Sequence, residues 1–470
     1  MLKDKRKVFV LVPDGVSLKN FAYTRFYTEA KERDFELVFW HHTPFDFDSF
    51  GYKHLILEEP KLHWFTTVLK NVRKRVEISC FTKRENDPIY HRYLFPLSYK
   101  NFKNTIRSIL TQFLAVCFNS EKDLRFLRKA INLLEARTSY YEHCINALEK
   151  HQPDLIYCTS QRNVLAIAPL LAGAKLEIPS VCFIFSWDNL PKATLDVPAD
   201  YYHVWSNHMK KELLHYYPFV KKHQITVTGT PQFEPHYDTE KLKTRAEFFS
   251  EHNLDINKRY ICYSGDDVTT SPKDPLYLKD VAQAIRNLNS KGHNLGLIFR
   301  RCPVDFSSRY DTVIANYKDV IVPIEPIWNK VGGAWDTILP MPEDLSLLSN
   351  LAFYTEAVIN LGSSMVFDYA IHNKPCLYMN YNYFNSDNIP KEGVYVYNYV
   401  HFRSMPNSDA VVWLNHPNTI AKSIEMVLES PNVTVCAARA WYEKINKHPA
   451  DSASMRIWDS IETIIKNNQA

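Results

Sequence analysis

Five short apolar runs of this sequence each end near residues that could bind a ligand or move a proton. Carboxylates such as Asp14 and Asp188 accept protons, and an arginine such as Arg300 can clamp a diphosphate with its fork of donors. In doubly wound sheets, ligands bind beyond the carboxyl ends of the strands, so these positions matter most. The candidates, in chain order, are Asp14, Asn20, Trp187, Asp188, Asn189, Ser264, Gly265, Arg300, Gly362, Ser363, Ser364 and Asp368.

The stretch 356–381 reads as a strand, a turn, a helix and a second strand. It opens with an apolar run typical of a buried parallel strand, and Gly362 then permits a tight turn. Ser363 or Ser364 can cap the following helix, whose first N–H groups suit a phosphate. Asp368 lies one turn into that helix, where it could accept hydrogen bonds from ribose hydroxyls. We expect a nucleotide-binding turn, although an ordinary strand–helix–strand unit with a serine cap has the same pattern.

Strands and helices alternate in two series, which predicts an α/β fold with two doubly wound, Rossmann-type domains facing a central cleft. The first domain is expected over residues 1–235, with a helical insertion at about 60–150. A polar and charged linker is expected over 236–258. The second domain, which holds the nucleotide-binding turn, is expected over 259–440. The segment 441–470 is predicted to be helical and to pack back onto the first domain.

The composition indicates a folded globular protein. The 470 residues are 46% hydrophobic and 23% charged, and the net charge of +4 gives no argument for a nucleic-acid partner. The nine cysteines include no CxxC pair and no zinc-like Cys/His spacing, so we expect reduced thiols and no metal site. The apolar run near the N-terminus breaks at Pro13, which favours a first strand over a signal peptide and predicts a cytoplasmic protein.

Positive charge is concentrated between residues 61 and 110. This window holds eleven Lys or Arg and three Asp or Glu, a local net charge of +8, together with eight aromatic residues. Basic residues interleaved with aromatics suit an anionic membrane surface, which predicts peripheral contact with the inner face of the cytoplasmic membrane. A solvated helical face over buried aromatics would explain the pattern equally well.

Six stretches together carry a family resemblance. They are, in chain order, FSWDNL, VWSNHMKKEL, ITVTGTPQF, YSGDD, FRRCP and NLGSSMVFDYAIHNKP. The chain resembles the GT-B glycosyltransferases of bacterial surface-polysaccharide biosynthesis, which build capsule and lipopolysaccharide. It is more distantly similar to the CDP-glycerol glycerophosphotransferases. The resemblance covers residues 180–380 well and the first 150 residues poorly.

The resemblance implies a nucleotide-diphosphate sugar as donor and no further cofactor. It assigns the donor diphosphate to the turn formed by Gly362, Ser363 and Ser364, and the ribose to Asp368. Gly265 would let the backbone approach the donor phosphates, and Ser264 and Arg300, each at a strand end of the same domain, are the further candidates for the donor. The acceptor would be a glycan, free or lipid-linked.

Two departures from the family pattern affect the expected mechanism. The relatives often carry Arg-x-His-Pro where this chain has Cys302 before Pro303, so no role of that histidine transfers. Retaining relatives commonly carry Glu-x7-Glu in this region, and here that spacing gives Asn360 and Asp368. The missing first glutamate favours an inverting, metal-independent displacement.

An inverting transfer needs a base for the acceptor hydroxyl and positive groups for the departing diphosphate. Asp188 and Asp14 are both candidates for the base, although each could instead be a turn residue. Trp187, Asn189 and Asn20 are the candidates for contacts with the acceptor.

Three other functions fit the same residues. The first is transfer of a polyol phosphate from a CDP donor, and the second is epimerisation of a nucleotide sugar, since epimerases share the two-domain plan. A non-catalytic binding or scaffold protein is the third. Binding of a panel of nucleoside diphosphates separates the scaffold from the enzymes and names the donor base.

Overall fold

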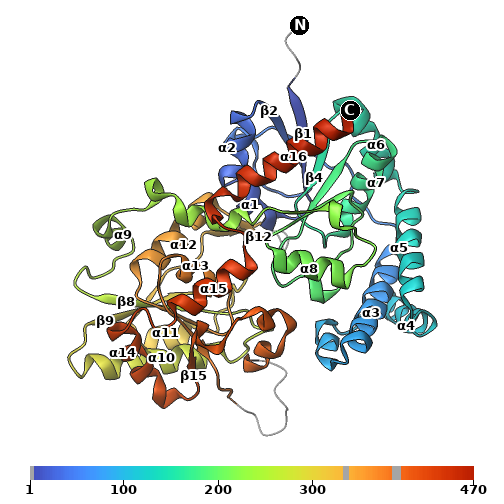
Figure 1. Cartoon of the computed structure of the whole chain (residues 1–470). Coiled ribbons are helices and arrows are strands. Elements are labelled where there is room, and N and C mark those ends of the chain that lie inside the picture. The colour runs from blue at the N-terminus through green and yellow to red at the C-terminus, as the bar shows by residue number, and fades with distance from the viewer. Residues whose placement is uncertain (1–4, 332–337, 384–392, 470) are drawn as a thin grey trace. The chain divides into compact units, whose positions relative to one another are not determined.

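The computed structural model describes residues 5–331, 338–383 and 393–469. The chain forms two compact units, each built on its own parallel sheet (Figure 1). Unit 1 comprises residues 1–231 and 445–470, and unit 2 comprises residues 232–444. The prediction of an α/β fold with two Rossmann-type sheets is therefore confirmed.

The sheet of unit 1 has seven parallel strands in the order β3-β2-β1-β4-β5-β6-β7. They are β1 (Arg6–Val12), β2 (Phe35–His41), β3 (His54–Ile56), β4 (Leu155–Cys158), β5 (Ser180–Phe183), β6 (Tyr201–Val204) and β7 (Ile225–Val227). The apolar side chains of β1 from Val8 to Val12 are all buried, as in a parallel strand covered on both faces. The strand order reverses between β1 and β4. The carboxyl ends of these two strands therefore flank the point at which such sheets bind ligands.

Nine described α-helices belong to unit 1, and four of them form an insertion between β3 and β4. The inserted helices are α3 (Thr66–Glu85), α4 (Phe102–Cys117), α5 (Glu121–Glu135) and α6 (Ser139–His151). The others are α1 (Leu18–Phe21), α2 (Arg25–Glu32), α7 (Ile167–Lys175), α8 (Asn207–Tyr216) and α16 (Ala453–Gln469). Ser120 and Asp123 form a capping box at the start of α5, which explains why the chain begins a new helix so soon after α4.

A buried ion network ties the insertion to the sheet domain. Arg73 of α3 is 1% exposed and forms ion pairs with Glu77 and Asp196. Arg128 of α5 donates to Glu77 Oε1 over 2.7 Å, and Arg73 also donates to the carbonyl oxygen of Ala193. One cation of the basic window 61–110 is therefore used inside the protein.

The C-terminal helix α16 packs against the start of the chain (Figure 1). Trp458 Nε1 donates to the carbonyl oxygen of Phe26 over 2.8 Å, and the two rings lie 5.1 Å apart between centroids. Residues 445–470 accordingly belong to unit 1, because the apolar face of α16 is buried against α2.

The main sheet of unit 2 has six parallel strands in the order β10-β9-β8-β13-β14-β15. They are β8 (Arg259–Ser264), β9 (Leu295–Arg300), β10 (Ile321–Pro323), β13 (Val358–Asn360), β14 (Cys376–Met379) and β15 (Val412–Leu414). The order reverses between β8 and β13, which makes their carboxyl ends the ligand-binding edge of this sheet. A separate antiparallel pair is formed by β11 (Trp328–Lys330) and β12 (Ile338–Pro340).

The helices described in unit 2 surround this sheet. They are α9 (Arg245–Glu251), α10 (Asp274–Asn289), α11 (Asp311–Asn316), α12 (Pro342–Tyr354), α13 (Met365–Ile371), α14 (Ile420–Glu429) and α15 (Val435–Ile445). None of the helices in the described parts of the chain is long and apolar enough to cross a lipid bilayer.

The segment 236–258, predicted as an interdomain linker, is instead part of unit 2. It contains α9, and Phe248 and Phe249 of this helix are buried in a core cluster with Tyr260 and Leu351. Polar residues dominate the segment, but these two aromatics anchor it. The division between the units lies earlier, after residue 231.

Candidate functional site

The carboxyl edge of the unit 2 sheet brings most predicted donor-binding residues together. Ser264 ends β8 and pairs in register with Arg300 at the end of β9. The N–H of Gly265 donates to the carbonyl oxygen of Arg300 over 2.8 Å. The turn that begins at Gly362 follows β13, the neighbour of β8 on the other side. The three segments thus meet at the carboxyl edge of the sheet, beside the switch point of the strand order.

Side chains hold the turn after β13 in place. Asn360 Oδ1 accepts from the N–H of Ser363 over 2.9 Å, and Ser363 Oγ accepts from the N–H of Met365 over 3.3 Å. Tyr378 donates its hydroxyl to the carbonyl oxygen of Ser363 over 2.8 Å. Ser364 remains exposed at the start of α13, so its hydroxyl and backbone can reach a ligand.

Both glycines of the edge are required by the packing of the protein itself. Gly362 has a φ of +67°, and a Cβ there would lie 3.0 Å from Val396 and 3.1 Å from Phe402. A Cβ at Gly265 would lie 3.0 Å from the hydroxyl of Tyr310. Substituting either glycine would therefore disturb the local fold, and it would not isolate an effect on ligand binding.

Asp368 is the centre of a buried chain of polar groups that the sequence analysis missed. His236 Nε2 lies 2.8 Å from Asp368 Oδ1, and His236 Nδ1 lies 3.0 Å from His372 Nε2. Burial, together with the electrostatic influence of the neighbouring His236 ring, lowers the pKa of His372 to about 4, so this ring is neutral at physiological pH. A neutral His372 can donate to His236, which then donates to the carboxylate. The chain orients Asp368 and leaves its Oδ2 without a hydrogen bond among the described residues.

Arg300 is largely committed to an internal ion pair. Its Nη2 donates to both carboxylate oxygens of Asp344 over 2.9 Å, and the residue is 4% exposed. Asp344 also accepts from the N–H of Ile327 and from Trp328 Nε1, each over 2.8 Å. Among the described residues, Arg300 Nη1 has no hydrogen-bond partner. Arg300 therefore has a buried donor without a partner, and the full fork that the sequence suggests is not free for a ligand.

The loop after β8 carries two adjacent aspartates in opposite electrostatic states. Burial and the carboxylates of Asp274 and Asp267 raise the pKa of Asp266 well above its ordinary value. Burial also acts to raise the pKa of Asp267, but hydrogen bonds from Thr269 and Thr270 outweigh it and lower that pKa. Asp266 therefore retains a proton at pH values at which Asp267 is ionised.

The two aspartates should respond differently to pH when each is replaced by asparagine. The folded protein binds the Asp266 proton more tightly than the unfolded chain does. The protonated side chain therefore stabilises the fold fully below the unfolded pKa of 3.8, and this stabilisation is lost as the pH rises. Asp266→Asn should thus raise the unfolding midpoint increasingly between about pH 4.5 and 7.5. The lowered pKa of Asp267 gives stability that is present throughout that range, so Asp267→Asn should lower the midpoint about equally at both ends. Thermal unfolding followed by circular dichroism tests this, and parallel pH profiles for the two variants would contradict it.

In unit 1, the loop after β1 buries Asp14 and Asn20. Asp14 is 2% exposed and accepts from the hydroxyl of Ser17 over 3.1 Å. Asn20 is fully buried, and within the described part of the chain its side-chain amide has no hydrogen-bond partner. An unsatisfied buried amide is costly, so Asn20 is suited to receive a polar ligand group or a water molecule.

The loop after β5 holds the other predicted residues of unit 1. Asp188 forms an ion pair with Lys192 and accepts from Asn189 Nδ2 over 2.9 Å, while Trp187 is buried. Gln161, which follows β4, donates to Asn189 Oδ1 over 2.9 Å and accepts from the N–H of residue 185. The loops after β4 and β5 are therefore joined through a buried glutamine that the sequence analysis did not select.

Comparison with solved structures identifies the architecture. The chain is similar to a co-structure of Staphylococcus aureus MnaA with UDP, with a TM-score of 0.55 and 11% identity over 98% of this chain and 97% of that one. It is similar to a UDP-GlcNAc 2-epimerase from Neisseria meningitidis bound to UDP-GlcNAc, with a TM-score of 0.56 and 11% identity over 97% and 100% of the two chains. A glycosyltransferase from Rickettsia africae matches with a TM-score of 0.50 and 12% identity over 99% and 100%. The chain has the GT-B fold. No protein-family model and no curated protein matches the sequence.

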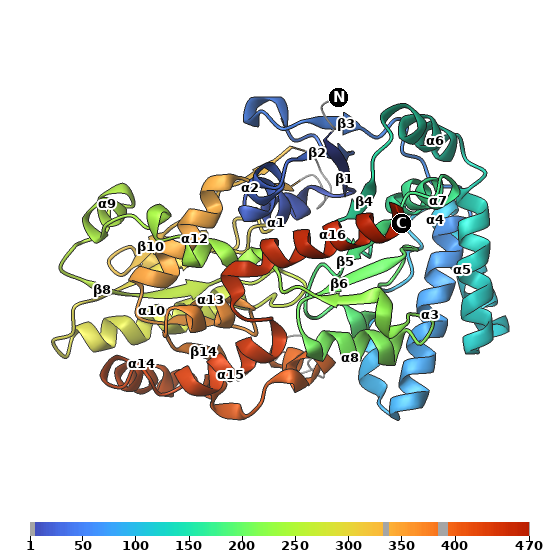
Figure 2. The same ribbon diagram turned by 45° about the horizontal axis from the view of Figure 1, so that its top comes forward.

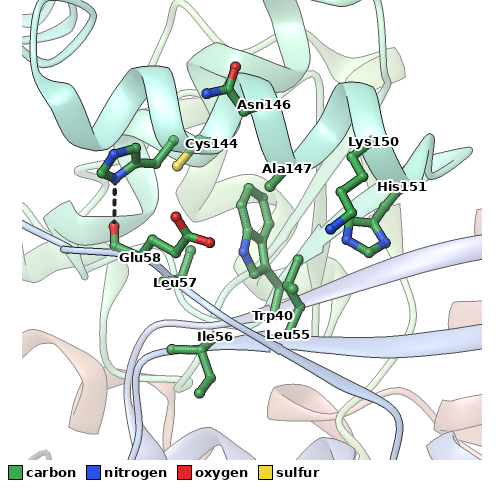
Figure 3. Close-up of a pocket in the computed structure, with 11 residues that line it drawn as sticks. Trp40, Leu55, Ile56, Leu57, Glu58, Cys144, Asn146, Ala147, Lys150 and His151 are labelled. Carbon is green, nitrogen blue, oxygen red and sulfur yellow. Dashed lines mark hydrogen bonds between the residues drawn. The ribbon is translucent and has the colours of Figure 1, made fainter.

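In this GT-B chain, a small pocket of unit 1 is distinct from the sheet edges described above. It lies between β2–β3 and α6, where the indole of Trp40 points toward Ala147 and His143 approaches the carbonyl oxygen of Glu58 (Figure 3). None of the predicted site residues lines it. Its volume of about 120 Å³ is well below the several hundred Å³ that ligand pockets of drug size occupy. It is therefore too small for a nucleotide sugar.

The residues that sequence analysis missed in this GT-B chain are mostly partners of residues that it selected. His236 contacts Asp368 and Asp344 contacts Arg300 across long distances in sequence, while His372 contacts His236. Only the position of His236 shortly after ITVTGTPQF could have drawn attention to it. In the parts of the chain that the structure describes, no three His, Cys, Asp or Glu side chains are grouped to hold a metal ion.

Proposed function

We propose that this chain is a glycosyltransferase that moves a sugar from a nucleotide-diphosphate donor to a glycan acceptor in the synthesis of a surface polysaccharide. The observation that carries the proposal is the convergence of Ser264, Gly265, Arg300 and the turn after β13 at the switch point of unit 2. A GT-B fold is compatible with this reaction, and the sequence resemblance to surface-polysaccharide glycosyltransferases favours it.

The donor is proposed to bind at the edge of the unit 2 sheet. The exposed Ser364, with backbone N–H groups of the turn, would contact the diphosphate, and Arg300 Nη1 would supply positive charge. Asp368 would accept hydrogen bonds from the ribose through Oδ2. The orientation of Asp368 by His236 supports this role, because a fixed carboxylate loses less freedom on binding.

The transfer is proposed to invert the anomeric carbon. An oxygen of the acceptor attacks that carbon, the bond to the diphosphate breaks, and the proton of the acceptor hydroxyl passes to a carboxylate of unit 1. Asp188 or Asp14 is the proposed base, and Trp187, Asn189 and Asn20 are proposed to contact the acceptor. Arg300 and backbone N–H groups are proposed to balance the charge of the departing diphosphate, so no step is routed through a metal ion.

Two alternative reactions have support of their own. The similarity to UDP-GlcNAc 2-epimerases favours epimerisation of a nucleotide sugar, and the more distant sequence resemblance to CDP-glycerol glycerophosphotransferases favours transfer of a polyol phosphate from a CDP donor. An epimerase would convert UDP-GlcNAc without any acceptor, and this conversion is visible by NMR. A polyol-phosphate transferase would bind CDP more tightly than UDP.

Nucleoside diphosphates should raise the unfolding midpoint of the protein, and one base should do so more than the others. A ligand at about 100 times its Kd stabilises a folded protein by about 2.7 kcal/mol, which is measurable as a thermal shift. The test uses UDP, CDP, GDP, ADP and dTDP, each with the matching nucleoside as control. If no diphosphate shifts the midpoint more than its nucleoside, the proposed donor site is wrong.

A further inference from the structure

Helix α4 exposes five large apolar side chains and buries two residues with hydroxyl groups. Five large apolar residues of this helix are between 41% and 81% exposed; they are Phe102, Ile106, Ile109, Phe113 and Val116. Its buried residues are Ser108 and Thr111, whose hydroxyls donate to the carbonyl oxygens of Ser98 and Arg107, each over 2.7 Å. A helix on a water-covered surface has the opposite arrangement.

The exposed apolar residues form one continuous stripe. Their spacing of four, three, four and three residues keeps all five within an arc of roughly 80° around the helix axis, at about 100° per residue. Phe95 and Tyr99, which precede the helix, are 82% and 53% exposed and extend the apolar surface. Helices α3, α4 and α5 lie beside one another in unit 1 (Figures 1 and 2). Single exposed apolar residues are ordinary, whereas a contiguous stripe of this kind indicates a binding surface.

The segment that contains the stripe carries basic residues and no acidic ones. Residues 88–120 include Arg92, Lys100, Lys103 and Arg107 but no aspartate or glutamate. Two further cations, both from α3, lie next to Phe95, which extends the apolar surface of the stripe. Lys74 Nζ lies 5.3 Å from the ring centroid of Phe95, and Arg75 donates to the carbonyl oxygen of Phe95. An apolar face flanked by lysines and arginines matches the boundary between the headgroups and acyl chains of anionic lipids.

We propose that α4 lies in the interface of an anionic phospholipid bilayer, with its apolar stripe among the acyl chains and its cations on the headgroups. A second copy of the chain would fit the apolar stripe less well than a bilayer. A twofold contact through this face would bring the cations of residues 88–120 together in both copies, with no acid of that segment to pair with them. The proposal does not depend on nucleotide binding by unit 2.

Sedimentation of the full chain with lipid vesicles tests the proposal. The protein should pellet with vesicles that contain roughly one-third phosphatidylglycerol, and much less with pure phosphatidylcholine. Binding should fall in about 1 M salt, where the Debye length is only about 3 Å.

Matched variants then test whether α4 is the element that binds. Ile109→Asp should lower the partition coefficient at least about tenfold, because an isoleucine leaves the apolar phase and each 1.4 kcal/mol is a factor of ten. Ile56→Asp is the control, since Ile56 is exposed to a similar degree, 58% against 55%, but lies on β3. The double variant Lys100→Gln/Lys103→Gln should lower the partition coefficient about 10–30-fold. Its control is the double variant Lys221→Gln/Lys222→Gln, which removes the same charge outside α4 and should have little effect.

The following results would overturn the proposal. The first is that Ile109→Asp binds vesicles as well as Ile56→Asp does, while circular dichroism shows that both variants are folded. The protein could also bind neutral and anionic vesicles equally. Finally, light scattering could reveal a dimer that Ile109→Asp dissociates while the wild type binds no vesicles, which would make this face a protein–protein interface.

Discussion

Asp188→Asn should lower turnover by about 10²–10⁴-fold and leave donor affinity nearly unchanged. The substitution keeps the shape of the side chain and an oxygen that can accept from Asn189 Nδ2, but it removes the proton acceptor. Asp188 is the more accessible of the two candidate bases, with 21% of its side chain exposed, whereas Asp14 is 2% exposed. Initial rates with saturating donor, together with the Kd of the nucleoside diphosphate, measure the two quantities separately.

Two further variants make this prediction specific. Asp188→Asn also removes the ion pair with Lys192, and Lys192→Gln breaks the same pair while it keeps the carboxylate. Lys192→Gln should therefore retain most of the activity. If Asp188→Asn is fully active and Asp14→Asn is not, the base is Asp14. A product with the same anomeric configuration as the donor would exclude a single displacement and the need for either base in that role.

Asp368→Asn should weaken binding of the nucleoside diphosphate by about 1–3 kcal/mol, which corresponds to about 5–150-fold in Kd. The reason is the loss of a charge-assisted hydrogen bond to the ribose from a carboxylate that is oriented by His236. Isothermal titration calorimetry with the ribonucleotide and its 2′,3′-dideoxy analogue isolates this contribution. The wild type should distinguish the two ligands, and Asp368→Asn should distinguish them much less.

Glu356→Gln is the matched control for this substitution. Glu356 also belongs to unit 2 and is paired with cations, Arg259 and Lys374, but it lies before β13 and not beyond its carboxyl end. Its replacement should leave nucleotide affinity unchanged. If Asp368→Asn weakens the ribonucleotide and the dideoxy analogue equally, the residue stabilises the site without contacting the ribose.

The sequence by itself determined the fold class and the strand ends that carry the candidate site. Parallel strands that are buried on both faces must be nearly continuous apolar runs, and runs such as Val8–Val12 are visible without a structure. A Gly-Ser-Ser turn after such a run predicts a tight turn from local conformational preference alone. Because loops after parallel strands share one edge of the sheet, Ser264, Arg300 and Gly362 could be expected to lie together.

Only the tertiary structure decided which of these groups remain for a ligand. The partner of Asp368 is His236, 132 positions earlier in sequence, and the partner of Arg300 is Asp344, 44 positions later. No local pattern encodes such a pairing, because it depends on which elements the fold brings side by side.

The same reason explains the error in the linker and the two interpretations that the sequence left open for the basic window. Residues 236–258 are polar enough to suggest a linker, but two buried phenylalanines, Phe248 and Phe249, hold them in the core of unit 2. Periodicity indicates that α4 is amphipathic, but it cannot tell which face meets the protein. Packing decided that Ser108 and Thr111 face inward and that the apolar stripe faces outward. Burial is a property of the assembled elements, so it could not be obtained from the sequence of one helix.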